Sequence, residues 1–180
     1  YSLEGGTVTR AADTYASAAT TVLDRDSGNK ESLWNNEAFT FGGIWRDIAR
    51  PGGNVVLFQV NDDGNNNDNS AQIRAIGSNN ANYRVYLKPD SGSSDSNNIP
   101  AKPIGELNKV FISNDSSRAS FHFNGTHSYE NLSSDKMSNV SKFQIAFQHW
   151  ATLSVHPCTI ERITFWKKVI PDANLINITQ

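Results

Sequence analysis

Residues that could carry out catalysis are scarce in this chain of 180 residues. Retaining glycoside hydrolysis needs two carboxyl groups about 5–5.5 Å apart, which one strand supplies by an E-x-D-x-E alternation. The six glutamates show no such pattern, and neither His122 nor His149 has a serine or cysteine nucleophile beside it in a recognisable turn. The sequence therefore predicts no catalytic residue and a protein that is not an enzyme. A polysaccharide hydrolase or lyase with an unrecognised site stays as a second alternative.

Patterns that could hold a metal ion are also weak. The segment DDGNNNDN at residues 62–69 offers many oxygen donors, and calcium could bind at Asp62, Asp63 and Asn65. The segment lacks the glycine that an EF-hand loop carries at its sixth position, so a solvated turn is the preferred interpretation. The four histidines show no ligand spacing convincing enough to propose a zinc site, and Cys158 has no second cysteine to pair with. We expect no metal and no cofactor.

Aromatic side chains stand close to amides at several points of the sequence. Proteins recognise sugars with an aromatic ring that stacks on the apolar C–H face and with amides or charged groups that bind the hydroxyls. The candidate carbohydrate-binding residues are Trp150 with Gln148 and Gln144, His122 with Arg118, Trp34, and Tyr83 with Asn80. A tryptophan in a strand more often packs than binds. The solvent exposure of Trp34, Trp150 and Tyr83 therefore decides between the two interpretations.

The composition of the chain restricts the fold class and the kinds of binding partner that we expect. A formal charge of -2 argues against non-specific binding to nucleic acid or to anionic membranes. No apolar run approaches the roughly 20 residues that span a bilayer, so we expect no membrane insertion. The 21 asparagines, with many serines and glycines, favour turns over helices. The composition indicates an all-β protein with long polar loops.

Short apolar runs predict about ten strands and one helix. The expected strands lie at Thr7–Ala11, within 31–49 with a break or bulge at Gly42-Gly43, at Asn54–Val60, on both sides of a turn at Ser78–Ala81, and within 108–115, 117–126, 142–150 and 159–169. Residues 89–103 are expected to form a low-complexity loop. The helix is expected at 171–179, with Pro171 in its first turn.

Alternation along these strands separates apolar from polar faces. Phe143 and Ile145 oppose Gln144, and Phe121 opposes His122. Two antiparallel sheets packed about 10 Å apart would bury the apolar faces against each other. The predicted fold is an antiparallel two-sheet β-sandwich, a jelly roll, with a short C-terminal helix. In that helix Leu175 and Ile178 are three residues apart and could cover the open end of the sandwich.

The C-terminal segment also resembles the closing sequence I-x-R-I-x-x-Y-x-x-x-L-x-D-x-x-L-x-x-L-T of concanavalin A-like (laminin-G-like) domains. The matching residues are Ile160, Arg162, Ile163, Trp166, Ile170, Asp172, Leu175, Ile178 and Thr179. The segment TVTRAAD at residues 7–13 is similar to the opening of these domains. Residues 60–77 and 108–125 resemble their central turn and a hairpin that includes Asn124-Gly125. Trp166 stands where the family has tyrosine, and the usual Gly-Trp before the last strand is absent.

Domains of this kind end many bacteriophage tail fibre, tailspike and prophage structural proteins. The resemblance implies one concanavalin A-like domain over 1–180, and the missing initiator methionine favours excision from a longer protein. It also implies a non-catalytic module that binds bacterial surface polysaccharide, located in a virion tail or outside the cell. A homotrimer within the parent protein would raise the avidity of weak single sites. The alternative function is a structural virion or trimer-end module that binds no sugar.

Overall fold

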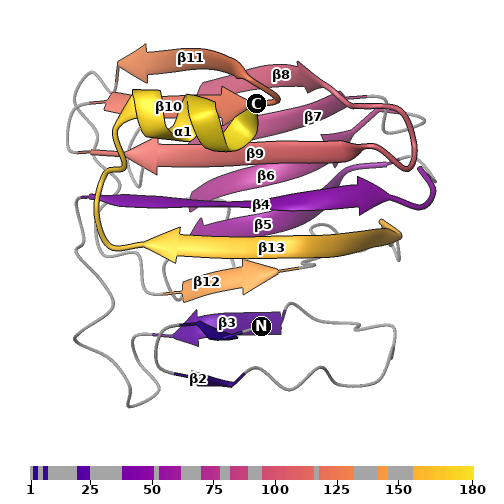
Figure 1. Ribbon diagram of the computed structural model, residues 1–180, viewed down its shortest axis with the longest axis horizontal. Coiled ribbons are helices and arrows are strands. Elements are labelled where there is room, and N and C mark those ends of the chain that lie inside the picture. The colour runs from indigo at the N-terminus through magenta and orange to yellow at the C-terminus, as the bar shows by residue number, and fades with distance from the viewer. Residues whose placement is uncertain are drawn as a thin grey trace.

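Two antiparallel sheets face each other in the computed structural model (Figure 1). It describes residues 2–3, 6–7, 20–24, 38–50, 53–61, 70–77, 82–88, 95–115, 118–131, 142–145 and 156–180. The five-stranded sheet has the order β11-β10-β9-β4-β13, the six-stranded sheet has the order β3-β12-β5-β6-β7-β8, and β1 pairs with β2. This arrangement confirms the predicted antiparallel β-sandwich with a short C-terminal helix.

The elements have the following bounds. They are β1 (Ser2–Leu3), β2 (Gly6–Thr7), β3 (Thr20–Asp24), β4 (Phe39–Asp47), β5 (Val55–Asn61), β6 (Ser70–Ile76), β7 (Asn82–Lys88), β8 (Asp95–Pro100), β9 (Leu107–Asn114), β10 (Arg118–Phe123), β11 (Thr126–Asn131), β12 (Lys142–Ile145), β13 (Cys158–Trp166) and α1 (Asp172–Thr179). Of the expected strand Thr7–Ala11, only Thr7 belongs to the described residues.

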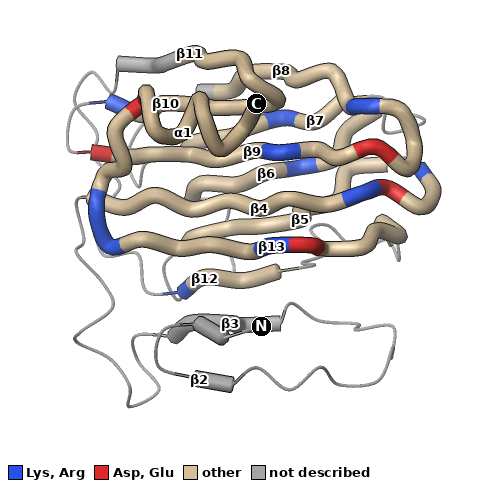
Figure 2. Tube along the Cα trace, in the orientation of Figure 1, with Lys and Arg blue, Asp and Glu red and all other residues tan. Residues whose placement is uncertain are grey.

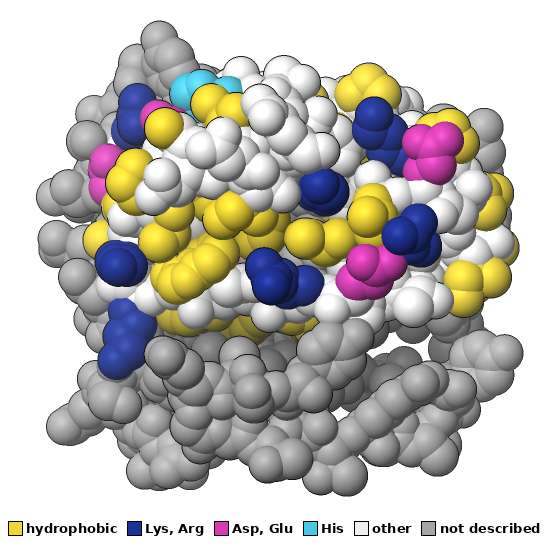
Figure 3. Space-filling view, viewed as in Figure 1, with side chains coloured by type: hydrophobic (Ala, Val, Ile, Leu, Met, Phe, Trp, Pro, Cys, Tyr) yellow, Lys and Arg dark blue, Asp and Glu magenta, His cyan; other side chains and the backbone are white. Residues whose placement is uncertain are grey.

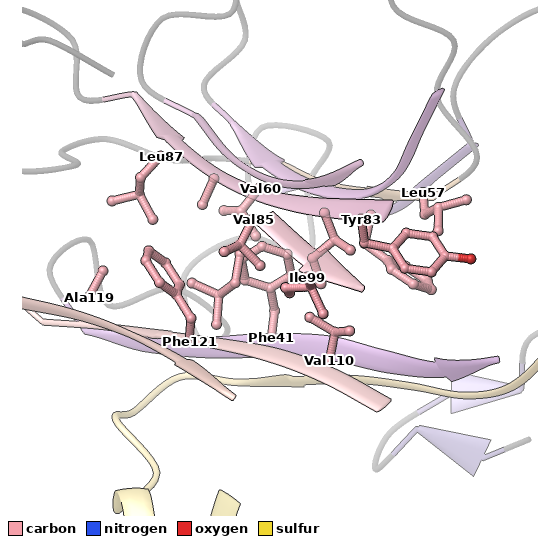
Figure 4. Close-up of a cluster of buried hydrophobic side chains, with 14 of the residues drawn as sticks. Phe41, Leu57, Val60, Tyr83, Val85, Leu87, Ile99, Val110, Ala119 and Phe121 are labelled. Atoms are coloured by element: carbon pink, nitrogen blue, oxygen red, sulfur yellow. The ribbon is translucent and has the colours of Figure 1, made fainter. Parts of the chain in front are cut away.

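The core lies between the sheets, where the inward side chains of both layers interdigitate (Figure 4). Phe121 and Phe143 are buried in it, as the alternation predicted. In β7, Val85 and Leu87 point into the core, while Tyr86 between them faces the other way. β5 is buried along its whole length, which confirms a strand covered on both faces. The period-two pattern therefore fixes which side chains can reach a binding face.

The predicted break or bulge at Gly42-Gly43 is wrong, because β4 runs through both glycines without interruption. A Cβ atom on Gly42 would lie 2.1 Å from the carbonyl oxygen of Val110. On Gly43 it would lie 2.7 Å from the ring of Phe58. The two glycines let a neighbouring strand and a core ring approach the backbone of β4 closely.

The predicted loop at residues 89–103 is also partly wrong, because it contains β8. This strand pairs with β7 and buries Ile99 completely. The hairpin between β10 and β11 turns at Asn124 and Gly125, with φ values of 47° and 81°. Positive φ at both positions matches the two-residue turn that twists with its flanking strands.

Helix α1 begins after Pro171 and packs against β9, β10 and β11. It lies on the outer face of the five-stranded sheet (Figure 1), so the expectation that it covers the open end of the sandwich is wrong. Leu175 and Thr179 are buried, whereas Ile178 is only half-buried. Among the described residues, no helix has the length and apolarity of a membrane span.

Candidate functional site

Polar side chains form three cross-strand rows on the outer face of the six-stranded sheet. They project there because each alternates with a core residue in its strand. The first row runs through Gln144, Gln59, Gln72, Tyr86 and Ser96. The second runs through Lys142, Asn61, Ser70 and Lys88, and the third through Arg74, Arg84 and Asn98. Side chains from distant parts of the chain are thus brought onto one surface.

Hydrogen bonds between amides tie the β12 side of this face together. Gln59 Nε2 donates to Gln144 Oε1 at 2.6 Å, and Asn61 Nδ2 donates to the same oxygen at 3.2 Å. Gln72 Nε2 donates to Ser70 Oγ at 3.1 Å. Gln59, Gln72 and Ser70 are buried although they point away from the core. This part of the face is enclosed, and its amides are held in fixed orientations.

The face becomes more open toward β7 and β8. Arg84 and Tyr86 are half-buried there, and Ser96 and Asn98 are exposed. The guanidinium carbon of Arg74 lies 4.0 Å from the centre of the Tyr86 ring. Arg84 Nε donates to Asn98 Oδ1 at 3.0 Å. A ligand can therefore meet guanidinium, ring and amide groups together at this edge.

The two guanidinium groups lie on neighbouring strands, because Arg74 and Arg84 are partners in the register of β6 and β7. Burial lowers the pKa of Arg74, the nearby Tyr86 raises it, and the charge of Arg84 lowers it further. Arginine stays protonated nonetheless, so the pair presents two positive charges. A half-buried pair of this kind favours a carboxylate or another planar anion, which guanidinium groups bind in a bidentate manner.

The charges of the sheet reinforce this preference. The strands β12, β5, β6 and β7 contain four basic and no acidic residues (Figure 2), namely Lys142, Arg74, Arg84 and Lys88. In the described part of this sheet, acidic residues occur in the outermost strands, as Asp24 in β3 and Asp95 in β8. The middle of the outer face is therefore electropositive.

The structure places the predicted binding residues in different environments. Gln144 lies on the outer face of the six-stranded sheet, as the alternation indicated. The expected exposure of Tyr83 is wrong, since its side chain is completely buried in the core. The aromatic residue of β7 on the outer face is Tyr86, three positions later, and it is half-buried. The alternation of NYRVYLK contained this signal, because Tyr83 shares a face with Val85 and Leu87.

His122 and Arg118 lie on the other sheet, beneath α1. His122 does point away from the core, as expected, but α1 covers it and leaves it no exposed surface. The expected accessibility of His122 to a sugar is therefore wrong. Arg118 keeps 39% of its side chain exposed and pairs with Asp172 at 3.1 Å. The structure thus separates these residues from Gln144 instead of joining them in one site.

The remaining predicted residues lie outside the described part of the chain and stay predictions. They are Trp150, Gln148, Trp34 and Asn80 among the sugar-binding candidates, and Asp62, Asp63 and Asn65 among the calcium candidates.

A buried polar network surrounds Asp47 at one end of the sandwich. Its carboxylate accepts hydrogen bonds from Trp45, Tyr83, His156, Arg50 and Asn108. Burial alone would raise the pKa of Asp47, but hydrogen bonds, first from His156 and then from Tyr83, lower it to about 2. The network joins β4, β7, β9 and the segment just before β13. Its buried position assigns it to the scaffold and not to ligand binding.

No family model matches the sequence, and no curated protein matches it. Solved structures do match. The CBM40 module of Ruminococcus gnavus IT-sialidase bound to α2,3 sialyllactose has a TM-score of 0.66 and 18% identity, covering 91% of this chain and 94% of that chain. The leech intramolecular trans-sialidase has a TM-score of 0.62 and 15% identity, and the match covers 89% of this chain and 26% of that chain. The binding domain of botulinum neurotoxin serotype D has a TM-score of 0.59 and 10% identity, and the match covers 84% of this chain and 38% of that chain.

This chain has a concanavalin-like jelly-roll fold. At identities below 20% the likeness establishes the fold, while the chemistry of the site rests on the residues of this chain. The Ruminococcus gnavus match spans nearly the whole of both chains, so the likeness in fold extends over most of this chain.

Proposed function

We propose that this chain is a non-catalytic carbohydrate-binding module that binds an acidic glycan on the outer face of its six-stranded sheet. The observation that carries the proposal is the pair formed by Arg74 and Arg84 beside the ring of Tyr86. The binding edge is formed by β6, β7 and β8, where the face is most open. The matching Ruminococcus gnavus module was solved with sialyllactose, a sugar that carries a carboxylate, and this supports an acidic ligand.

Each chemical part of an acidic sugar has a counterpart at this edge. The guanidinium groups of Arg74 and Arg84 suit the carboxylate. Ser96 and Asn98 can exchange hydrogen bonds with hydroxyls, since both are exposed. Tyr86 offers an amphipathic ring close to them, which suits the C–H face of a sugar. This combination explains why an acidic sugar fits better than a neutral one.

The strands that carry acidic residues in the described part of this sheet argue against glycoside hydrolysis on this face. In the described part of the six-stranded sheet, the acidic residues Asp24 and Asp95 lie in its two outermost strands. Five strand spacings of about 4.8 Å separate those strands by roughly 24 Å. Paired catalytic carboxyl groups stand at most about 9.5 Å apart. The two strands that carry these acids are therefore too far apart to supply such a pair.

Glycan-array binding tests the proposal. The array should hold neutral sugars, sialylated oligosaccharides and acidic bacterial polysaccharides. We expect binding to be confined to acidic glycans and to weaken with added salt, because partly exposed ion pairs are screened. Replacing Arg84 with glutamine removes a charge-assisted interaction of about 1.5–3 kcal/mol, which corresponds to roughly a 10- to 150-fold loss of affinity.

Arg46→Gln is the matched control, because Arg46 lies on the other sheet and is 42% exposed beside Glu161. It should bind like the unmodified chain. Binding to neutral sugars alone, or equal affinities for Arg84→Gln and Arg46→Gln, would refute the proposed site.

The more specific function indicated by the sequence resemblance is part of the same proposal. It is a phage-tail receptor-binding domain that recognises bacterial surface polysaccharide, in a virion or outside the cell. Binding to capsule or lipopolysaccharide in preference to sialylated sugars would support it, and sedimentation would measure the proposed trimer. No binding to any glycan would favour the alternative of a structural virion module.

A further inference from the structure

Two histidines and an aspartate converge where α1 meets the hairpin of β10 and β11. His122 in β10 and His127 in β11 are cross-strand partners, and their rings stack with centres 4.6 Å apart and planes inclined by 18°. Asp172 is the first residue of α1. These three residues come from three elements, and 50 positions separate His122 from Asp172.

The distances within this trio suit coordination of one metal ion. His122 Nε2 lies 3.1 Å from Asp172 Oδ1, and His127 Nε2 lies 3.6 Å from Asp172 Oδ2. One ligand atom from each of the three residues can be chosen so that all three lie within 4.8 Å of one another. Around a tetrahedral zinc ion with bonds of 2.0–2.1 Å, neighbouring ligand atoms stand about 3.3 Å apart. The trio is therefore close to the spacing that an ion needs.

The surroundings provide both orientation and access. Arg118 Nη2 lies 3.1 Å from Asp172 Oδ2, and Ser120 also hydrogen-bonds this carboxylate. Such outer contacts hold a ligating carboxylate in place, although the positive charge of Arg118 weakens the attraction for a cation. His122 is buried, whereas the side chains of His127 and Asp172 are 26% and 27% exposed. Figure 3 shows histidine atoms at the surface beside α1, where an ion can enter from solvent.

We propose that His122, His127 and Asp172 form a binding site for a divalent transition-metal ion, with Zn²⁺ the best match. Two imidazoles and one carboxylate are a ligand set that zinc accepts, with water in the fourth position. The bound ion fastens α1 to the β10–β11 hairpin. The site lies on the five-stranded sheet, away from the proposed glycan site, so each proposal can fail without the other.

The test uses the whole chain after treatment with a chelator. Titration calorimetry with ZnCl₂ should give saturable binding of one ion per chain, and Co²⁺ should give the visible absorption of a tetrahedral complex. Excess Zn²⁺ should raise the melting temperature, because an ion that binds only the folded state stabilises it. Absence of saturable binding of both ions overturns the proposal.

Variants locate the ion. His127→Ala and Asp172→Asn should each weaken Zn²⁺ binding by at least tenfold and abolish the rise in melting temperature. Glu161→Gln is the matched control for charge, because Glu161 is 41% exposed and lies elsewhere on the sheet. It should leave Zn²⁺ binding unchanged. His127→Gln serves as a second variant if His127→Ala fails to fold. Unchanged binding in folded His127 and Asp172 variants would place the ion elsewhere and refute the site.

Discussion

Replacing Asp47 with asparagine should strongly destabilise the fold while keeping the shape of the side chain. In the native chain, Oδ1 accepts hydrogen bonds from Trp45 at 3.1 Å and from His156 at 2.9 Å, and Oδ2 accepts one from Arg50 at 2.8 Å. An asparagine has one oxygen and one NH₂ group. Whichever way the amide is turned, its NH₂ group faces at least one buried donor, and the negative charge that Arg50 meets is lost.

The size of the effect follows from burial. Removing one partner from a buried, hydrogen-bonded charge pair costs about 3–5 kcal/mol. The lowered pKa of Asp47 gives a partial check. A drop from 3.8 to about 2 corresponds to about 2 kcal/mol of extra stability for the ionised form, and the clash of donors adds to this. With a urea slope of about 2 kcal/mol/M, the midpoint should fall by roughly 1.5–2.5 M.

The assay is urea unfolding followed by tryptophan fluorescence, since Trp45 donates to Asp47. The control is Arg46→Gln, which breaks an exposed pair and should cost less than about 1 kcal/mol. The loss of unfolding free energy caused by Asp47→Asn should depend on pH. Asp47 has a lower pKa in the folded state than in the unfolded state, so its contribution is complete above pH 4 and is lost as the pH falls toward 2. If Asp47→Asn lowers the unfolding free energy by less than about 1 kcal/mol at pH 7, or if this loss does not shrink in acid, the role given to the network is refuted.

Three further outcomes are expected. Gly42→Ala should lower the unfolding free energy by about 3 kcal/mol or more in the urea assay, because the new methyl group meets the backbone of β9. Gly77→Ala should lower the unfolding free energy by only about 1 kcal/mol, since a Cβ atom there meets open space and only the φ of 93° disfavours a side chain. Equal losses of unfolding free energy in the two glycine variants would contradict the packing argument. Burial raises the pKa of Cys158 to about 12, which leaves about one thiolate in ten thousand at pH 8. Its reaction with a disulfide reagent should therefore be slow in the folded chain and fast in urea, and a fast reaction in both states would show that the thiol is accessible.

The sandwich could be predicted from sequence because its strands follow a simple period. Phe121 and Phe143 alternate with polar neighbours, and both reach the core as expected. β8 was missed because DSNNIP carries one large apolar side chain, Ile99, among residues typical of loops. The glycine pair was misinterpreted because glycine marks both irregular backbone and tight packing. The positions of Val110 beside Gly42 and of Phe58 beside Gly43 distinguish the two interpretations.

The candidate sites were harder to predict because they depend on which strands become neighbours. Gln144 was placed on the correct face, but its partner Gln59 lies 85 positions away. Arg74 and Arg84 become a pair only through the register of β6 and β7. His122 and His127 have a spacing that occurs in zinc sites, but the third ligand, Asp172, lies 45 positions further along the chain. Only the packing of α1 on β10 and β11 brings it beside the two rings.

The hydrogen-bonded amides beside the proposed glycan site have an entropic consequence. A free glutamine loses about 1.5–2 kcal/mol of rotamer entropy when it is fixed. Gln59 and Gln144 already restrain each other at 2.6 Å, so that loss occurs during folding. A sugar that reaches Gln144, the half-buried member of the pair, would meet an amide that is already oriented, and the entropic penalty of its binding would fall mainly on the ligand.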